Sequence, residues 1–430
     1  MDFKKLNIAT GWLVFVVATW TFVTTIEPTA SFWDCGEFLA TANKLQVGHP
    51  PGAPLFMILG RIASAFVSTE NVPVAINILS ALSGSFTILF LFWSITHMAK
   101  KLATRDTDEP MTTGQLIAVL GSGIVGSLAY TWSDSFWFSA VEAEVYSMSS
   151  FFTAITFWTI LKWESEAHEP HNTRWLILIC YLLGLSIGVQ LLGLLCIPAI
   201  ALVYYFKKFK TTTKGVVYAL VISALILGTI QSVIIPGVAK VAGWFELRFV
   251  NDFGLPFNTG NLVYGALVVG LTVWGLMWTQ RNGKVILNTI ILGVAVILFG
   301  YSTYAMTVIR SLANPPIDEN NPENVFNLVS YLNREQYGDR PLLMGQFWDS
   351  EMSDERGDGS PVYTATYKVM KGGRVEKLFY DGWSADHYVE GKPELSIKNE
   401  YIITDDRKGS EPMYEPQFTM LFPRMYSSQE

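Results

Sequence analysis

Charged residues are scarce in this sequence. Asp, Glu, Lys and Arg make up 16% of its 430 residues, whereas soluble domains carry about 25%. Half of the residues are hydrophobic, 14% are aromatic and the mean hydropathy is +0.31. This balance fits a polytopic membrane protein better than a water-soluble domain.

Cysteine and the familiar cofactor motifs are also rare or missing. The three cysteines, Cys35, Cys180 and Cys196, are too few and too scattered for a disulfide framework. There is no Walker phosphate loop, no zinc-ligand spacing, no heptad pattern and no long repeat. The sequence assigns no cofactor, leaves a divalent cation open, and predicts no nucleic-acid partner.

Long apolar runs, by contrast, are abundant. About 20 apolar residues cross a bilayer core, so the runs predict about nine transmembrane helices. They lie near residues 8–26, 73–98, 114–131, 145–161, 175–189, 191–206, 215–235, 261–279 and 285–305. We interpret the first as a retained span; a cleaved secretory signal is the alternative.

Lys and Arg fall in alternate loops, which predicts the orientation, because positively charged loops stay in the cytoplasm. The N-terminus is therefore expected to be cytoplasmic, with residues 27–72 and 132–146 and the tail outside. If residues 53–69 also crossed the membrane, every later loop would invert. We therefore expect an interfacial or re-entrant helix there.

The tail changes character after residue 305. A helix is expected from the spacing of the apolar residues between Val325 and Leu332, and strands at "RPLLMGQFW" and around the Gly372–Gly373 turn signal. We predict a transmembrane domain over 1–305 and a small extracytoplasmic α+β domain over 306–430. The final "LFPRMYSSQE" does not resemble a closing element, so we expect the chain to be part of a longer protein.

Two acids without local cations follow the first span, in "SFWDCGEF". Ser31 and Asp34 fit a capping box that starts a helix, with Glu37 one turn beyond Asp34 on the same face. The simpler interpretation is that Asp34 caps the helix and Glu37 is solvated. The alternative is a catalytic or metal-binding carboxylate whose pKa is raised by partial desolvation.

Other candidate residues lie in the outward loops. Glu142 and Glu144 form a second acidic pair among aromatic residues. His49 begins a rigid His-Pro-Pro-Gly turn that either only redirects the chain or binds substrate. Gln190 lies at a tight turn between two spans, where packing is the simpler role and binding of a sugar hydroxyl the other. Arg248 is a rare outward cation, suited to a phosphate or to lipid headgroups.

These features resemble a known superfamily. The first span, the loop with Asp34 and Glu37, "GHPPGAPLF" and the second loop's "EAEVY" resemble the GT-C membrane glycosyltransferases. More narrowly, "EPTASFWDCGEFLATANKLQVGHPPGAPLF" and "NPPIDENNPENVFNLVSYLNREQYGDRPLLMGQ" resemble the bacterial domain-of-unknown-function family 2723. That family is similar to protein O-mannosyltransferases and is common in Bacteroidetes. Two positions depart from its pattern, which places His and Asn where this chain has Gln190 and Gly193.

The resemblance implies a GT-C-like fold and transfer of a sugar, with mannose as one candidate. The donor would be a polyprenyl-phosphate carrier and the acceptor a hydroxyl, on Ser or Thr of translocated proteins or on a glycan. The reaction would occur at the periplasmic face of the inner membrane. Asp34 is expected to be the base and Glu37 to orient it or an acceptor group. His49, Glu142, Glu144, Gln190 and Arg248 would bind substrate, and Glu142 and Glu144 are the candidate ligands if a divalent cation takes part.

Two other functions stay open from the residues. A transporter or flippase of lipid-linked sugars would also be polytopic, but it would carry ionisable groups at mid-membrane on broken helices. A non-enzymatic envelope scaffold would need neither acidic loop. Substitution of Asp34 distinguishes two of these functions: a scaffold should tolerate it, whereas a transferase should lose activity.

Overall fold

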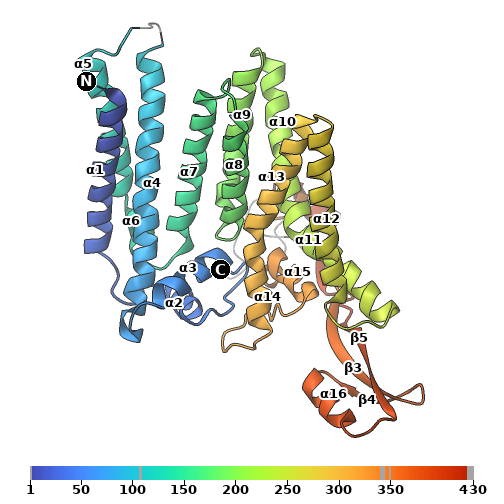
Figure 1. The fold of residues 1–430 in the computed structure, drawn as a ribbon. Helices are drawn as coiled ribbons and strands as arrows, with labels where there is room; N and C mark the ends of the chain where they lie inside the picture. The colour runs from blue at the N-terminus through green and yellow to red at the C-terminus, as the bar shows by residue number, and fades with distance from the viewer. Residues whose placement is uncertain (1, 106–108, 339–343, 348–349, 424–430) are drawn as a thin grey trace. The chain divides into compact units, whose positions relative to one another are not determined.

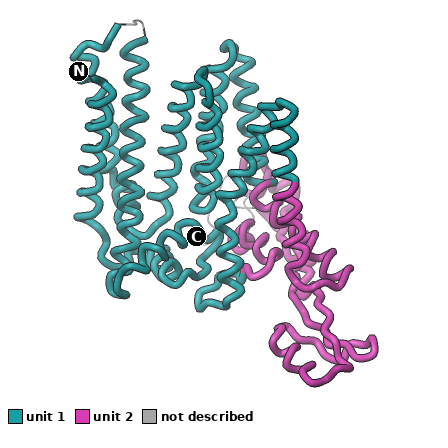
Figure 2. The backbone as a smooth tube through the Cα atoms, in the orientation of Figure 1, with its two compact units in different colours: residues 1–233, 271–321 teal, residues 234–270, 322–430 magenta. Residues whose placement is uncertain are grey.

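The computed structural model describes residues 2–105, 109–338, 344–347 and 350–423. The chain packs into two compact units (Figure 2), one of residues 1–233 with 271–321 and the other of 234–270 with 322–430. These units describe packing, and the sequence-based domain boundary between residues 305 and 306 stays a prediction.

Helices make up the first unit, in which Figure 1 shows long helices running side by side. Their bounds are α1 Phe3–Thr24, α2 Cys35–Lys44, α3 Pro54–Ser64, α4 Val72–Ala103, α5 Thr113–Thr131, α6 Asp134–Val141, α7 Val145–Ser165, α8 Thr173–Ile187, α9 Cys196–Lys208, α10 Thr213–Thr229, the end of α12 Thr259–Arg281, α13 Val285–Tyr301 and α14 Ala305–Ser311.

Seven helical segments of the described chain are long and apolar enough to cross a membrane, as in a multi-pass membrane protein. The nine expected spans all fall on helices, but α7 and α8 are not among the seven. With 15 residues, α8 is about 22 Å long, less than the thickness of a typical hydrocarbon core. The count of nine and the GT-C class stay predictions.

Close helix contacts depend on small residues. Helix α4 packs against α1, α5 and α7. Helices α8 and α13 approach closely at Gly184 and Gly300, where a Cβ atom on Gly300 would lie 2.5 Å from the carbonyl carbon of Gly184. Glycine lets two backbones meet in this way, as small residues do between membrane helices.

The basic loops of the first unit gather at one end. Lys100 at the end of α4 lies over the Phe3 ring at the start of α1, 4.8 Å from its centroid, and Lys101 pairs with Glu164 at the end of α7. The short helices α2 and α3 lie at the opposite end in Figure 1. The loops expected on one side of the membrane are therefore at the same end of the structure.

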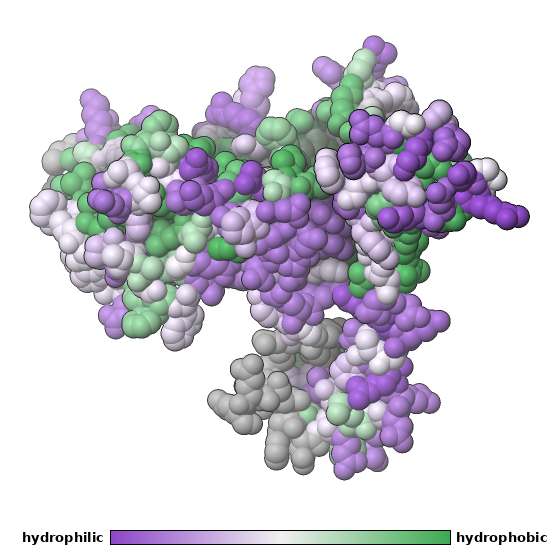
Figure 3. All heavy atoms as spheres, turned by 90° about the horizontal axis from the view of Figure 1, so that it is seen from below, coloured by the Kyte–Doolittle hydropathy of each residue, from purple (hydrophilic) through white to green (hydrophobic). Residues whose placement is uncertain are grey.

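Helices α2 and α3 are fixed by a shared apolar core. The buried face of α2, with Phe38 and Leu39, packs with Phe56 and Met57 of α3 in a cluster that includes Val145 and Met148 of α7. With 11 residues, α3 is about 16 Å long and too short to span. The interfacial or re-entrant position expected over 53–69 stays a prediction. Figure 3 looks onto this end of the molecule, where hydrophilic side chains are prominent.

The second unit contains α11 Ile235–Leu247, the start of α12, α15 Val325–Asn333 and α16 Gly382–Val389. Its strands are β1 Met344–Gln346, β2 Met352–Gly357, β3 Val362–Lys371, β4 Arg374–Phe379, β5 Leu395–Asp405, β6 Glu411–Tyr414 and β7 Thr419–Leu421. All pairs are antiparallel, in the orders β1-β7, β2-β6 and β4-β3-β5.

Two local predictions in the tail are confirmed. Strands β3 and β4 form the hairpin expected at Gly372–Gly373, where both glycines have positive φ. The amphipathic segment forms α15, capped by the Asn324 side chain, which accepts from the backbone N–H groups of Phe326 and Asn327. Much of "RPLLMGQFW" and of "LFPRMYSSQE" lies outside the described residues.

Candidate functional site

Asp34 occupies the N-cap position of α2, but its carboxylate does not cap the helix. The backbone carbonyl of Asp34 accepts from Phe38 N at 2.9 Å, whereas its side chain makes no cap hydrogen bond. The side chain is 51% exposed. The capping box expected at Ser31 is wrong, because the helix begins at Cys35 and the Ser31 hydroxyl donates to Glu142 instead.

Glu37 lies on the next turn and is fully engaged by His49. Its Oε1 accepts from the backbone N–H of His49 at 2.6 Å, and its two oxygens lie 3.1 and 3.0 Å from His49 Nδ1. This approach requires glycine at position 48, where a Cβ atom would be 2.6 Å from Glu37 Oε1.

The charge state of Glu37 follows from this contact. Burial acts to raise the pKa of the Glu37 carboxyl, but the side-chain and backbone hydrogen bonds from His49 and its charge together outweigh burial and hold the pKa below its usual value. An ionised carboxylate can only accept, so Nδ1 of His49 carries the hydrogen in this pair. This hydrogen bond also fixes the orientation of the ring.

The imidazole of His49 brings the two acids of α2 into one cluster. Its other ring nitrogen, Nε2, lies 3.9 Å from Asp34 Oδ2. The chain then turns back, with the His49 carbonyl accepting from Gly52 N at 2.8 Å. The rigid turn thus places the imidazole against the acidic helix, as the sequence led us to expect.

Glu142 and Glu144 lie between α6 and α7 and are almost fully buried, with 4% and 5% of their surface exposed. Burial raises the pKa of the Glu142 carboxyl; the Ser31 hydroxyl offsets part of this and the charge of Glu27 adds to it. Burial also raises the pKa of Glu144 to about 7; the hydrogen bond from Val145 N lowers it, and the charges of Asp34 and Glu142 raise it.

The acids of the two loops lie close enough to interact, because the charge of Asp34 in the first loop acts on the pKa of Glu144 in the second. No Lys or Arg forms an ion pair with Asp34, Glu37, Glu142 or Glu144 within the part of the chain that the structure describes. The structure therefore brings together five of the seven residues singled out in the sequence, with His49 as their basic group.

Asn77 was missed by the sequence reasoning. It is fully buried in α4, and its Nδ2 donates to the backbone carbonyls of Glu27 at 2.6 Å and Thr29 at 3.3 Å. Its Oδ1 has no hydrogen-bond partner among the described residues. An amide at the start of an apolar span was the available signal, and Asn77 fixes the loop that carries Ser31 towards Glu142.

Gln190 and Arg248 lie apart from these contacts. Gln190 precedes a short 3-10 helix whose turn is attached to α3 by the bond from Leu55 N to the Gly188 carbonyl, 2.8 Å long. Its Oε1 is buried without a hydrogen-bond partner in the described chain. Arg248 belongs to the second unit and pairs with Asp252 at 2.7 Å. The substrate-binding roles of both stay predictions.

The geometry suggests a different set of metal ligands from the one expected. One ligand atom each from Asp34, Glu37 and His49 lies within 4.8 Å of the other two, so this set fits a divalent cation. The expected role of Glu142 and Glu144 as ligands stays a prediction.

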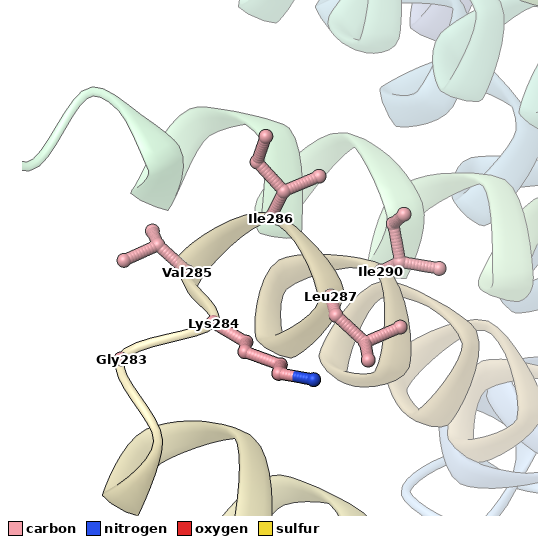
Figure 4. Close-up of a pocket in the computed structure, with 6 residues that line it drawn as sticks. All are labelled: Gly283, Lys284, Val285, Ile286, Leu287 and Ile290. Carbon is pink, nitrogen blue, oxygen red and sulfur yellow. The ribbon is translucent and has the colours of Figure 1, made fainter.

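A shallow, open apolar pocket occurs elsewhere, at the start of α13 (Figure 4). It is lined by Gly283, Lys284, Val285, Ile286, Leu287 and Ile290. None of the candidate acids lines it, and its one ionisable group is an ammonium. We therefore place the candidate site at the α2 cluster.

Comparison with known proteins finds similarity in the part of the chain that contains the α2 cluster. Residues 34–213 match the model of the N-terminal domain of protein O-mannosyl-transferase TMEM260. This chain is similar to protein O-mannosyl-transferases. The match begins at Asp34 and includes Glu37, His49, Glu142, Glu144 and Gln190, while Arg248 falls outside it.

Two curated relatives are also named protein O-mannosyl-transferases. Protein O-mannosyl-transferase tmem260 of Dictyostelium discoideum is 28% identical over 159 residues, which are 35% of this chain and 17% of that protein. Protein O-mannosyl-transferase TMEM260 of Mus musculus is 24% identical over 202 residues, 46% of this chain and 26% of the relative. The chain thus matches about a quarter or less of each relative's length. No solved structure matches. Family 2723 and the Bacteroidetes type stay predictions.

Proposed function

We propose that this chain is a membrane glycosyltransferase that moves a sugar from a polyprenyl-phosphate carrier to the hydroxyl of Ser or Thr in a protein. The observation that carries the proposal is the half-exposed Asp34 carboxylate, which lies beside a partly buried Glu37–His49 pair at the start of the segment similar to protein O-mannosyl-transferases. Mannose is the sugar that the names of the relatives suggest.

Asp34 is the proposed general base. The acceptor oxygen attacks the anomeric carbon, its proton passes to Asp34, and the bond from the anomeric carbon to the phosphate oxygen breaks with its electron pair leaving on the lipid phosphate. A positioned carboxylate serves this purpose in inverting glycosidases, where it activates water. Exposure and the absence of a capping bond leave the Asp34 carboxylate accessible to an acceptor.

The other clustered residues would orient the reactants. Glu37 holds the ring of His49, whose Nε2 faces Asp34, so that both groups address the same substrate. Glu142 and Glu144 would bind sugar hydroxyls, Glu144 as donor when protonated. If a divalent cation bound at this cluster, Asp34 would be one of its ligands instead of the base, and the cation would supply positive charge for the leaving phosphate.

We place this site on the periplasmic face of the inner membrane. The basic loops meet at the end of the first unit away from α2 and α3, and basic loops stay in the cytoplasm. The cluster would then face the compartment into which unfolded proteins and lipid-linked sugars emerge.

The test compares glycopeptides from cells with the wild-type protein, a deletion, Asp34→Asn, and Asp134→Asn as a matched control at the same end of the molecule. Loss of a general base lowers transfer about 100-fold or more. We expect a specific Ser- or Thr-linked glycan to disappear in the deletion and Asp34→Asn cells and to persist in Asp134→Asn cells, at equal protein levels by blot. Unchanged glycans in every strain would reject protein glycosylation and favour a glycan acceptor or transport.

A further inference from the structure

The loop that carries His49 is held from two sides. On one side the Glu37 carboxylate binds the backbone and ring of His49. On the other, Val47 forms a short parallel β-bridge to Asp318, far along the chain. Val47 N donates to the Ile317 carbonyl at 3.2 Å, and Glu319 N donates to the Val47 carbonyl at 3.1 Å.

Side chains extend this bridge. Gln46 is buried, and its Oε1 accepts from Ile317 N at 3.0 Å. Arg310, at the end of α14, donates from Nε to the Leu45 carbonyl at 2.6 Å and from Nη2 to the Lys44 carbonyl at 3.4 Å. These are terminal carbonyls of α2, which lack partners within the helix and attract a cation. The guanidinium thus fixes the end of the helix that bears Asp34 and Glu37.

The segment from residue 310 to 321 is itself cross-linked by hydrogen bonds. The Ser311 hydroxyl lies 2.9 Å from Asp318 Oδ2 and 3.0 Å from Asn321 Oδ1. The segment, which contains "NPPIDEN", is therefore closed on itself and bound to residues 44–47, two positions before His49. We call residues 310–321 the strap.

We propose that the strap is a positioning element for the Glu37–His49 pair, with Arg310 as its principal contact to α2. The kinetic test of this inference rests on the proposed transferase function, whereas the test by histidine modification does not. The strap closes the loop on the side opposite Glu37. Without it, residues 45–48 would keep the bonds of Leu45 N and Gln46 N to the last turn of α2 and the contacts of His49, but the outer side of the loop would lose its support. The ring would then be held less firmly at its distance from Asp34.

Arg61 provides a matched control. It donates from Nη1 to the Asn43 carbonyl at 2.6 Å, so it also binds the last turn of α2, but from α3 and without contact to the strap. Arg310→Gln and Arg61→Gln thus remove the same kind of bond from the same helix end. Ser311→Ala is a second test variant that loosens the strap and leaves α2 untouched.

The first readout is independent of activity. Carbethoxylation of histidines by diethylpyrocarbonate is followed by peptide mass spectrometry on the full chain in detergent, with His97, His168 and His171 as internal references. We expect Arg310→Gln to raise the modification rate of His49 roughly tenfold, the factor for loss of one charge-assisted hydrogen bond. Ser311→Ala should change it in the same direction, and Arg61→Gln should leave it near the wild-type rate.

The second readout is kinetic. Misplacement of a catalytic group lowers turnover, so we expect kcat of Arg310→Gln to fall about tenfold with KM for the lipid donor unchanged, and Arg61→Gln to keep the wild-type kcat. Equal His49 modification in Arg310→Gln, Ser311→Ala, Arg61→Gln and wild type would overturn the positioning role. A wild-type chain without transfer activity, but with His49 exposed by Arg310→Gln, would reject the proposed function and support the strap.

Discussion

Substitution of Glu144 by Gln should make the protein more stable at alkaline pH. Glu144 is buried, with 5% of the residue's surface exposed, and its carboxyl lies near the charges of Asp34 and Glu142. Burial is the main cause that raises its pKa from 4.5 to about 7. Gln has nearly the same shape, carries no charge, and keeps an oxygen to accept from Val145 N.

The sign and size of the effect follow from proton linkage. Below pH 4.5 the carboxyl is protonated in both folded and unfolded chains, so the substitution changes little. Between pH 4.5 and about 7 the unfolded chain releases the proton while the folded chain keeps it, and stability falls as pH rises. Above pH 7 the full difference is present, about 3 kcal/mol. Glu144→Gln removes this cost.

The assay is the thermal midpoint of the detergent-solubilised chain, wild type and Glu144→Gln, from pH 4.5 to 8.5. About 3 kcal/mol corresponds to a gain of several degrees for the variant at pH 8, and we expect near equality at pH 4.5. A variant that is less stable than wild type at pH 8 would refute the reasoning, because it would show that the ionised Glu144 is stabilised in the folded state. Repeating the scan with a chelator tests whether a bound cation supplies that stabilisation.

Two further substitutions test individual contacts. Gly48→Ala should push the Glu37 carboxylate away from the His49 N–H, since the new Cβ would lie 2.6 Å from Glu37 Oε1. We expect kcat to fall at least about tenfold, and wild-type kinetics would contradict the geometry. Glu246→Ala should destabilise the second unit by roughly 2–4 kcal/mol, because buried Glu246 accepts from two backbone N–H groups near the start of α12 and from the Tyr401 hydroxyl. Thermal unfolding measures that loss, and an unchanged midpoint would show that the donors find other acceptors.

Hydropathy and turn chemistry predicted most of the helices and the tail hairpin because these signals are local. The apolar runs correspond to helices, and Gly372–Gly373 forms the expected turn, since only local backbone preferences decide such a turn. The placement of acids on one face of α2 was also readable, because residues three apart on a helix lie on the same side.

Pairwise contacts between distant segments could not be read in the same way. Ser31 matched a capping pattern, yet its hydroxyl reaches Glu142, 111 residues away, and the helix starts four residues later. Nothing local marks Asp318 as the partner of Val47, because a single β-bridge leaves no periodic pattern. The buried state of Glu144 likewise depends on packing of α7 against α2 and α3, which no charge count reveals.

The cluster explains how a chain so poor in charge tolerates acids beside a membrane. The partly buried Glu37 is held by His49, and the buried acids have other compensation: Glu142 is bound by the Ser31 hydroxyl, and Glu144 keeps a proton near neutral pH. Asp34 differs, because its carboxylate is half exposed, makes no cap hydrogen bond, and lies 3.9 Å from the His49 ring. The Asp34 carboxylate therefore does not help to hold the start of α2. Glu37, Glu142 and Glu144 have partners that account for their positions. For Asp34 we propose that the missing partner is the hydroxyl of a substrate.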